Sequence, residues 1–265
     1  MKPLTEFPRD ARQAIKGVLC DIDDTLSTEG RITAEAYGAM ERLQQAGLLV
    51  IPVTGRPAGW CDLVARMWPV DGVVGENGAF YFRYDRAARK MRRHFVDDAV
   101  ARAGYRTRLA QIGFEIVKAI PGTAIAADQH YRETDLAIDF CEDVAPLPPS
   151  AVEEIVMRME KHGLTAKVSS IHVNGWFGRY DKLSTTQALM REAFGVDLDI
   201  AREQYVFVGD SPNDAPMFGF FPHAVGVANI LAFGARVDPL PAYICRQRCG
   251  AGFNEIVNAV LAALG

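Results

Sequence analysis

The stretch "GVLCDIDDTLSTEG" at residues 17–30 decides the fold class. It opens on a short apolar run, typical of a strand that is buried on both faces of a parallel sheet. Three acids follow within four positions: Asp21, Asp23 and Asp24. Like charges this close repel one another unless a cation lies among them or one carboxyl group stays protonated. The stretch therefore predicts a buried strand that ends at a chemically active edge.

The regions before residue 85 and after residue 180 alternate between strand-like and helix-like patterns. Strand, helix and strand at this rhythm predict an α/β fold, a doubly wound, Rossmann-like parallel sheet with right-handed crossovers. Strands are expected at 15–21, 48–55, within 71–85, at 204–210 and at 223–229, and helices at 33–47, 57–68, 182–195, after 211 and at 253–264.

The pattern of predicted strands and helices changes between about residues 84 and 175. A proline-rich link at 142–150 separates a strand-like segment at 134–141 from a helical one at 151–163. Further strands are expected within 164–174. We therefore expect an inserted α+β cap domain at 83–176 and a catalytic core made of residues 1–82 and 177–265.

Composition narrows the class of partner. The 265 residues carry a formal charge of −4 with a pI near 5.8, which argues against nucleic acid. We interpret the basic stretch at 83–94 as a solvated hairpin or helix face. Apolar runs are too short to span a bilayer, and the beginning of the chain has no apolar signal region. We expect neither a nucleic-acid partner nor a membrane, and the oligomeric state stays open.

Cysteine and histidine usage points to the cytoplasm and away from zinc. The five cysteines are scattered and odd in number, which is typical of reduced thiols in a cytoplasmic protein. The five histidines form no HxH or HxxxH pair, so a zinc site is not indicated.

Polar residues follow several predicted strands at their carboxyl ends, where doubly wound sheets bind ligands. Four separate segments thus contribute acids, a lysine and small hydroxyl or glycine residues to one edge. These residues are Asp21, Asp23 and Thr25, then Thr54, Gly55 and Arg56, then Lys182, and finally Gly209, Asp210, Ser211, Asn213 and Asp214.

This set suits phosphoryl transfer with a hard cation. Carboxylates with an asparagine are oxygen ligands for Mg²⁺, which is often shared with a phosphate. A threonine–glycine turn offers a hydroxyl and N–H groups to phosphate oxygens, and a lysine adds positive charge. One carboxylate can attack phosphorus and a second, two residues on, can serve as acid and base. A calcium loop is disfavoured because its sixth and twelfth positions would be Leu26 and Ile32.

The motifs "DIDDT", "VTGR", "DK" and "GDSPND" resemble, in this order, the haloacid dehalogenase superfamily of phosphohydrolases. The likeness covers about residues 1–82 and 177–265. The position of the insert and "GENGA" at 75–79 resemble the branch with a large α/β cap, which includes Cof-type and sugar-phosphate phosphatases. Residues 171–182 and 209–218 are similar to mannosyl-3-phosphoglycerate and sucrose-phosphate phosphatases.

The resemblance implies a role for each motif residue. Asp21 would attack phosphorus, and Asp23 would protonate the leaving alkoxide and then activate water. Thr54 and Gly55 would bind phosphoryl oxygens, and Lys182 would offset the charge that Asp21 and the phosphate share.

The resemblance also implies the cofactor Mg²⁺. Its ligands would be Asp21, the backbone carbonyl of Asp23, and Asp210, with Asn213 or Asp214 contributing directly or through water. Arg56 lies beside the phosphate turn, and we expect it to shape the leaving-group pocket. Asp24 stands where many relatives carry glycine, and aspartate tolerates unusual backbone angles better than most residues.

The cap carries polar residues near predicted loops and strand ends, which we expect at the surface rather than at the substrate. They are Asp128, His130, Arg132, Glu133 and Asn174. Trp176 and Phe177, at the return to the core, are expected to pack at the hinge.

These observations predict a Mg²⁺-dependent phosphatase that hydrolyses a small phosphorylated metabolite, a sugar phosphate, through an aspartyl-phosphate intermediate. One alternative is a phosphomutase on the same fold, which would need a bisphosphate activator and release no inorganic phosphate. Another is a non-catalytic sensor that binds sugar phosphates. The acid pair argues against the sensor, because a pure binder has no need for Asp23.

Overall fold

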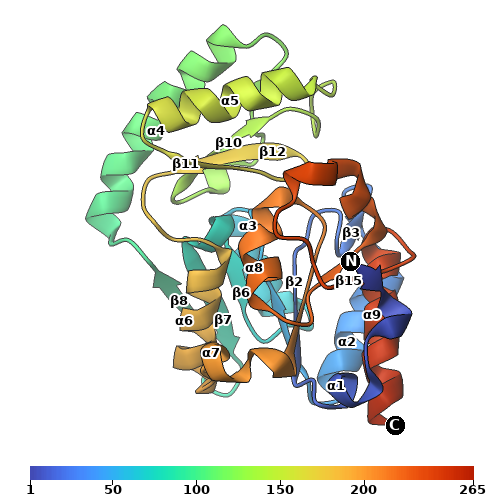
Figure 1. Ribbon diagram of the computed structural model, residues 1–265. Coiled ribbons are helices and arrows are strands. Elements are labelled where there is room, and N and C mark those ends of the chain that lie inside the picture. Colours follow the sequence, from blue (N-terminus) through green and yellow to red (C-terminus); the bar gives the residue numbers. More distant parts are fainter.

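The structure is a computed structural model that describes residues 1–265. Its main sheet has six parallel strands in the order β1-β15-β14-β13-β2-β5 (Figure 1). The predicted α/β doubly wound class is therefore confirmed. The strands are β1 (Lys2–Pro3), β2 (Gly17–Cys20), β5 (Leu49–Pro52), β13 (Tyr205–Gly209), β14 (Val225–Gly226) and β15 (Tyr243–Ile244).

Alternate residues of the central strands face two separate layers of helices. Val18 and Cys20 pack in the same core cluster as residues of α2 and α9, whereas Leu19 packs with residues of α6 and α8. Both faces of the sheet are therefore covered, which explains why β2 is apolar throughout. The helices of the core are α1 (Arg9–Gln13), α2 (Ala34–Gln45), α3 (Ala58–Met67), α6 (Lys182–Phe194), α7 (Leu198–Ala201), α8 (Ala215–Phe220) and α9 (Cys249–Leu264).

A three-stranded antiparallel sheet extends this core. It consists of β6 (Val73–Gly75), β7 (Phe80–Asp85) and β8 (Lys90–Phe95), and Val74 also bridges to Val53. The basic stretch at 83–94 lies in the hairpin of β7 and β8. A further short hairpin, β3 (Ser27–Thr28) with β4 (Arg31–Ile32), follows the aspartates of the opening stretch.

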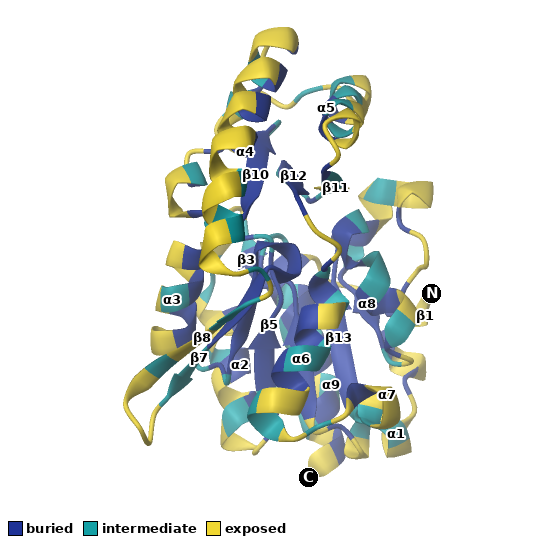
Figure 2. Ribbon diagram, turned by 90° about the vertical axis from the view of Figure 1, so that its left-hand side faces the viewer, coloured by how far each residue is buried: buried dark blue, intermediate teal, exposed yellow.

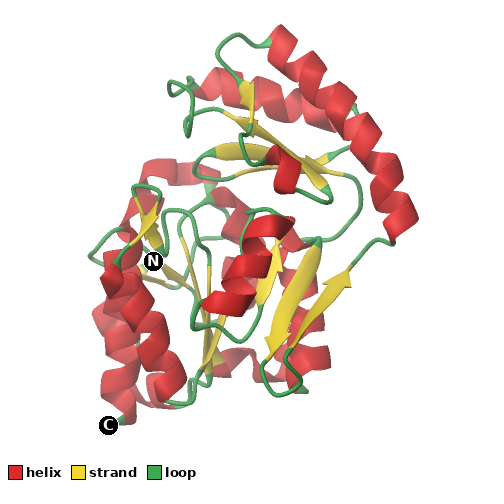
Figure 3. Cartoon of the chain, turned by 180° about the vertical axis from the view of Figure 1, so that it is seen from behind, coloured by secondary structure: helices red, strands yellow, loops and turns green.

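The remaining sheet is antiparallel and lies over the core, with two helices on its far side (Figures 1 and 3). Its strand order is β11-β12-β10-β9. One face packs Leu136, Ile138 and Val173 against α4 and α5, so the other face is directed toward the core. These elements are α4 (Ala99–Ala119), β9 (Ala124–Ile125), β10 (Asp135–Asp139), α5 (Pro149–Lys161), β11 (Thr165–Val168) and β12 (His172–Trp176).

The expected division into core and cap can be refined from these sheets. The boundary expected between residues 82 and 83 falls inside β7, whose partner β8 continues the sheet that starts at β6. We propose that the cap begins at α4 and ends with β12. Trp176 belongs to the apolar cluster of the core and Phe177 to that of the cap. The segment that returns from the cap to the core therefore packs against both domains.

One expectation about local structure was wrong, and one helix was missed. The strand expected at 223–229 is limited to β14, because a 3-10 segment at Ala228–Arg236 takes over. Helix α4 was not anticipated: only four of its 21 residues are buried, and most of its surface is exposed (Figure 2). None of the helices has both the length and the apolar character needed to cross a membrane.

Gly78 allows the "GENGA" segment to lie close to the start of α6. Its φ is +107°, and an added Cβ would lie 2.0 Å from the carbonyl oxygen of Asp181, directly before Lys182. Its own carbonyl accepts a hydrogen bond from Thr185 of α6. The absence of a side chain at this position therefore lets the start of α6 lie against the segment.

We expect Gly78→Ala to lower the free energy of unfolding by about 3 kcal/mol or more, since strain and a backbone clash combine. Gly163→Ala is the matched control: its φ is +80°, but nothing lies within 4 Å of the added Cβ. The control should cost only about 1 kcal/mol. Urea unfolding of both variants measures the difference, and equal losses would contradict the close approach.

Candidate active site

Three aspartates meet where β2 and β13 end side by side. Asp21 follows β2, Asp210 follows β13, and Asp214 ends the 3-10 turn Pro212–Asp214. One carboxylate oxygen from each lies within 4.8 Å of the others, and all three residues are buried. Adjacent parallel strands thus bring together acids that are nearly 190 positions apart.

Lys182, the first residue of α6, is the cation of this cluster. Its Nζ donates to Oδ1 of Asp21 at 2.8 Å and to Oδ1 of Asp214 at 2.7 Å, and its side chain is 1% exposed. Burial lowers the pKa of an ammonium group, but the two carboxylates outweigh it and raise the pKa of Lys182. Lys182 therefore stays charged in a buried site.

One ammonium group does not balance three carboxylates. Burial raises the pKa of Asp21; Lys182 opposes this, and the charges of Asp214 and Asp23 raise the pKa further. Burial, followed by the charges of Asp21 and Asp214, also raises the pKa of Asp210. The site is therefore short of positive charge, which a divalent cation would supply.

The three carboxylates differ in how many hydrogen bonds they already accept. Asp214 accepts from Lys182 and from the N–H groups of Asp210 and Ser211. Asp210 accepts from Thr25 Oγ1 at 3.2 Å and Asn229 Nδ2 at 2.9 Å. Since a carboxylate has about four acceptor positions, Asp21 and Asp210 keep the most room for a metal.

Asp23 lies at the same edge but is held by Arg56. Nε of Arg56 donates to both carboxylate oxygens of Asp23, at 2.9 and 3.1 Å. The guanidinium also contacts Asp128 at 3.3 Å and Glu142 at 2.5 Å, both from the cap. Three carboxylates thus share one guanidinium, and Arg56 connects the core aspartate to the cap.

The turn after β5 places Thr54 and Gly55 beside this cluster. Thr54 Oγ1 accepts the N–H of Arg56 at 3.0 Å, and its carbonyl accepts the N–H of Asn77. An added Cβ at Gly55 would lie 3.1 Å from Nδ2 of Asn77. Gly55 therefore leaves its backbone open toward the asparagine.

Asn77 is a site residue that the sequence did not single out. Asn213 Nδ2 donates to its Oδ1 at 3.1 Å, and Ser211 Oγ in turn donates to Asn213 Oδ1 at 2.7 Å. This series of hydrogen bonds leaves Nδ2 of Asn77 without a partner, although the residue is buried and only 2% exposed. The signal in the sequence was the "GENGA" segment at 75–79, which contains Asn77; the structure adds that its φ is 54°, a conformation in which asparagine is enriched.

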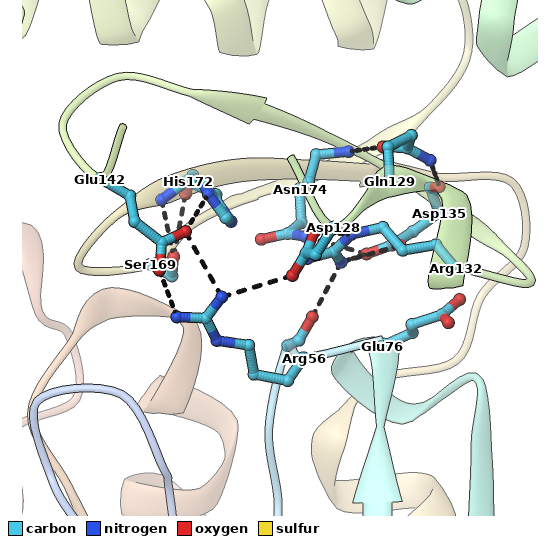
Figure 4. A network of polar contacts seen from close by, with 12 residues as sticks. Arg56, Glu76, Asp128, Gln129, Arg132, Asp135, Glu142, Ser169, His172 and Asn174 are labelled. Carbon is cyan, nitrogen blue, oxygen red and sulfur yellow. Dashed lines mark hydrogen bonds and ion pairs between the residues drawn. The ribbon is translucent and has the colours of Figure 1, made fainter. Parts of the chain in front are cut away.

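The cap presents a polar face to Arg56, as Figure 4 shows. Asp135 and Asn174, on neighbouring strands, are hydrogen bonded at 2.9 Å. Arg132 pairs with Asp128 and Asp135 at 3.0 Å and donates to the carbonyl of Gly55 at 2.9 Å. The last contact joins the cap directly to the phosphate turn that the sequence predicted.

The expectation that the polar cap residues lie at the surface was wrong for three of them. Asp128, Arg132 and Asn174 are buried. Asn174 lies on the core-facing side of β12, whereas Asp128 and Arg132 flank the 3-10 turn Gln129–Tyr131, where Asp128 pairs with both Arg56 and Arg132. His130 is exposed and Glu133 is half-buried. Glu142 and His172, with an Oε2-to-Nε2 distance of 3.0 Å, were missed altogether. Burial raises the pKa of Glu142, but its contacts with His172 and Arg56 lower it to about 2.

Glu76 links the core to the cap through hydrogen bonds. It is fully buried and accepts the N–H groups of Ala58 at 2.9 Å, Glu133 at 2.9 Å and Thr134 at 2.7 Å, as well as the hydroxyl of Thr134. Burial and Asp135 raise the pKa of Glu76, while Arg132 lowers it. The carboxylate thus satisfies donors from both domains.

Residues 18–102 match the family model of haloacid dehalogenase-like hydrolases. The predicted resemblance is confirmed. No curated protein sequence matches the chain.

Solved structures share the haloacid dehalogenase-like fold over nearly the whole chain. Thermoplasma acidophilum 0175 has a TM-score of 0.69 at 18% identity, covering 93% of this chain and 98% of its own. The sucrose-phosphatase of Synechocystis sp. PCC6803 reaches 0.62 at 14%, with coverages of 93% and 98%. The C-terminal domain of C. albicans trehalose-6-phosphate phosphatase reaches 0.70 at 12%, with coverages of 99% and 98%. At these identities the likeness establishes the fold alone.

We expect Glu76→Gln to lower the free energy of unfolding by about 1–3 kcal/mol, because the amide turns an N–H₂ group toward N–H donors. Hydrogen exchange at Glu133 and Thr134 should accelerate. Glu153→Gln, on the exposed side of α5, is the control and should change stability by less than about 0.5 kcal/mol. Unchanged stability and exchange in Glu76→Gln would show that the contact does not hold the domains together.

Proposed function

We propose that the protein is a Mg²⁺-dependent phosphatase that hydrolyses a small phosphorylated metabolite through an aspartyl-phosphate intermediate. The observation that carries this proposal is the position of Asp21. One of its oxygens accepts a hydrogen bond from the buried Lys182. The carboxylate of Asp210 lies close enough for both aspartates to bind the same metal ion. The Thr54–Gly55 turn follows β5, which pairs with β2 directly before Asp21. A nucleophilic carboxylate, a counter-charge and a phosphate-binding turn are what phosphoryl transfer requires.

The first half-reaction uses Asp21 as the nucleophile. A carboxylate oxygen of Asp21 forms a bond to phosphorus as the bond to the ester oxygen breaks, and Asp23 gives its proton to the departing alkoxide. Thr54 and Gly55 bind phosphoryl oxygens, and Lys182 offsets their charge. Both carboxylate oxygens of Asp23 accept a hydrogen bond from Nε of Arg56, so Arg56 must release at least one of these bonds before that oxygen can carry the proton.

The second half-reaction uses Asp23 as the base. Asp23 takes a proton from water, whose oxygen attacks phosphorus, and the bond to Asp21 breaks to free inorganic phosphate. Mg²⁺ would be held by Asp21, the carbonyl of Asp23, and Asp210, with Asn213 or Asp214 directly or through water. When bound, it would neutralise part of the charge that the carboxylates and the phosphoryl group share.

The polar face of the cap supports a sugar phosphate as substrate. Carboxylates, an imidazole and an amide are suited to exchanging hydrogen bonds with sugar hydroxyls. Two proteins of the same fold are described as a sucrose-phosphatase and a trehalose-6-phosphate phosphatase. We also propose a cytoplasmic location, in keeping with five free cysteines.

Asp21→Asn tests the nucleophile. We expect wild type to release phosphate from members of a sugar-phosphate panel with Mg²⁺, and the variant to be slower by about 10³-fold or more, since an amide is a poor nucleophile. Asp10→Asn, at an exposed aspartate of α1, is the matched control and should keep wild-type turnover. Comparable turnover by Asp21→Asn would refute the assignment; transfer between sugar hydroxyls without phosphate release would indicate a mutase.

Asp210→Asn tests the metal site. Without Mg²⁺ the variant should unfold at or above the wild-type midpoint, because a buried like charge is removed. Saturating Mg²⁺ should stabilise wild type by about 2–3 kcal/mol at a hundredfold excess over its Kd, and the variant far less. Thermal unfolding with Mg²⁺ or EDTA measures both effects; an equal Mg²⁺ response in the two proteins would exclude Asp210 as a ligand.

A further inference from the structure

An apolar pocket opens beside Asp23. It is lined by residues of α3, of the hairpin formed by β3 and β4, and of the cap turn Gln129–Tyr131. Its volume is about 450 Å³, and eight of its thirteen lining residues are hydrophobic. Pockets of this size and character are typical binding sites for small molecules. The proposed reaction uses Asp23 and Arg56 from this lining but none of the apolar residues.

Three large apolar side chains that line the pocket are exposed. Trp60 is 43% exposed, Leu63 51% and Tyr131 50%. Trp60 and Leu63, three positions apart, lie on one face of α3, whereas Tyr131 comes from the cap. A single exposed apolar residue needs no explanation, but several gathered around a cavity indicate a surface that a ligand covers.

The cap forms one side of this pocket because it packs closely on α3. An added Cβ at Gly59 would lie 3.0 Å from the Cβ of Tyr131. The glycine therefore lets the turn that carries Tyr131 lie directly against the start of the helix. Core and cap both line the pocket, as they both surround Arg56.

The pocket offers no free charge to a ligand. Its only charged lining residues are Asp23 and Arg56, and both carboxylate oxygens of Asp23 accept hydrogen bonds from Nε of Arg56. The guanidinium carbon of Arg56 also lies 4.4 Å from the centre of the Trp60 ring, so the indole connects the apolar lining to this ion pair. A charged group would lose its hydration here without gaining a free partner, which favours a neutral apolar occupant.

We propose that this pocket binds an apolar group, such as an aromatic ring, of the alcohol that the reaction releases. The inference rests on the proposed function, in which Asp23 gives its proton to the ester oxygen and must lie within hydrogen-bond distance of it. The carbon attached to that oxygen then lies beside Asp23, where the pocket begins. The substrates are thereby narrowed to phosphate monoesters whose alcohol carries an apolar group. A sugar phosphate that bears such a group would use both this pocket and the polar face of the cap.

Two esters that differ by one phenyl ring test this substrate class. 2-Phenylethyl phosphate and ethyl phosphate are both esters of primary alcohols, so their chemistry at phosphorus is nearly the same. We expect wild type with Mg²⁺ to have a kcat/KM about tenfold higher for the phenylethyl ester, the equivalent of about 1.4 kcal/mol. Leu63→Asp places a charge in the pocket lining and should remove most of this preference.

Met67→Asp is the matched control for the added charge. Met67 lies on the same helix, is 67% exposed and does not line the pocket. Because the two esters carry the same charge, its effect on the phosphate cancels in their ratio, and the control should keep the wild-type ratio. Equal kcat/KM values for the two esters in wild type, or a preference that Leu63→Asp leaves intact, would overturn the proposal.

Titration with 2-phenylethanol, the released alcohol, tests the pocket apart from the reaction. In proton–nitrogen correlation spectra recorded without Mg²⁺, the indole N–H signals of Trp60 and Trp68, which line the pocket, should shift as the alcohol is added. The signal of Trp176, which is 1% exposed in the core cluster, should not shift. Leu63→Asp should weaken the binding about tenfold.

The outcomes separate this inference from the proposed function. If esters are hydrolysed but Trp60 and Trp68 do not respond to the alcohol, the pocket is overturned and the function stands. Signals that shift only when the protein is diluted would assign the exposed residues to contact between two copies of the chain and would also overturn the pocket. If the alcohol binds but no ester is hydrolysed, the proposed function and the leaving-alcohol assignment fail, whereas the apolar binding site stands.

Discussion

The contact of Lys182 with Asp21 and Asp214 is the interaction on which the site depends. An ammonium group that is 1% exposed is stable only because two carboxylates accept its hydrogen bonds at 2.7–2.8 Å. These three residues come from β2, the start of α6 and the turn after β13. The contact therefore fixes the return of the chain from the cap against both central strands, and Gly78 makes room for it.

Arg56 has the corresponding role between core and cap. It binds Asp23 of the core while Asp128 and Glu142 of the cap compete for the same guanidinium. A change in the position of the cap would therefore alter the contacts that Arg56 makes with Asp23. This links the placement of the cap to the position of the residue that we propose as acid and base.

The core could be predicted because its information is local. The strand ending at Asp21, the Thr54 turn and the segment around Asp210 each carry a short motif at the carboxyl end of a buried strand. The cap lacked such signals. Helix α4 buries only a few residues, and the polar face of its sheet looks like an ordinary solvent-facing pattern in the sequence. Asp128 and Arg132 lie between β9 and β10, and as polar residues near a predicted loop they were expected at the surface.

The sequence by itself determined the fold class and the order in which the acids, the turn and the lysine occur, since buried parallel strands and their terminal residues have a recognisable pattern. Only the tertiary structure decided which groups face one another across domains. Whether a carboxylate meets water, Arg56 or Lys182 depends on contacts between residues that are far apart in the chain. For the same reason, the unpaired amide Nδ2 of Asn77 became apparent only in three dimensions.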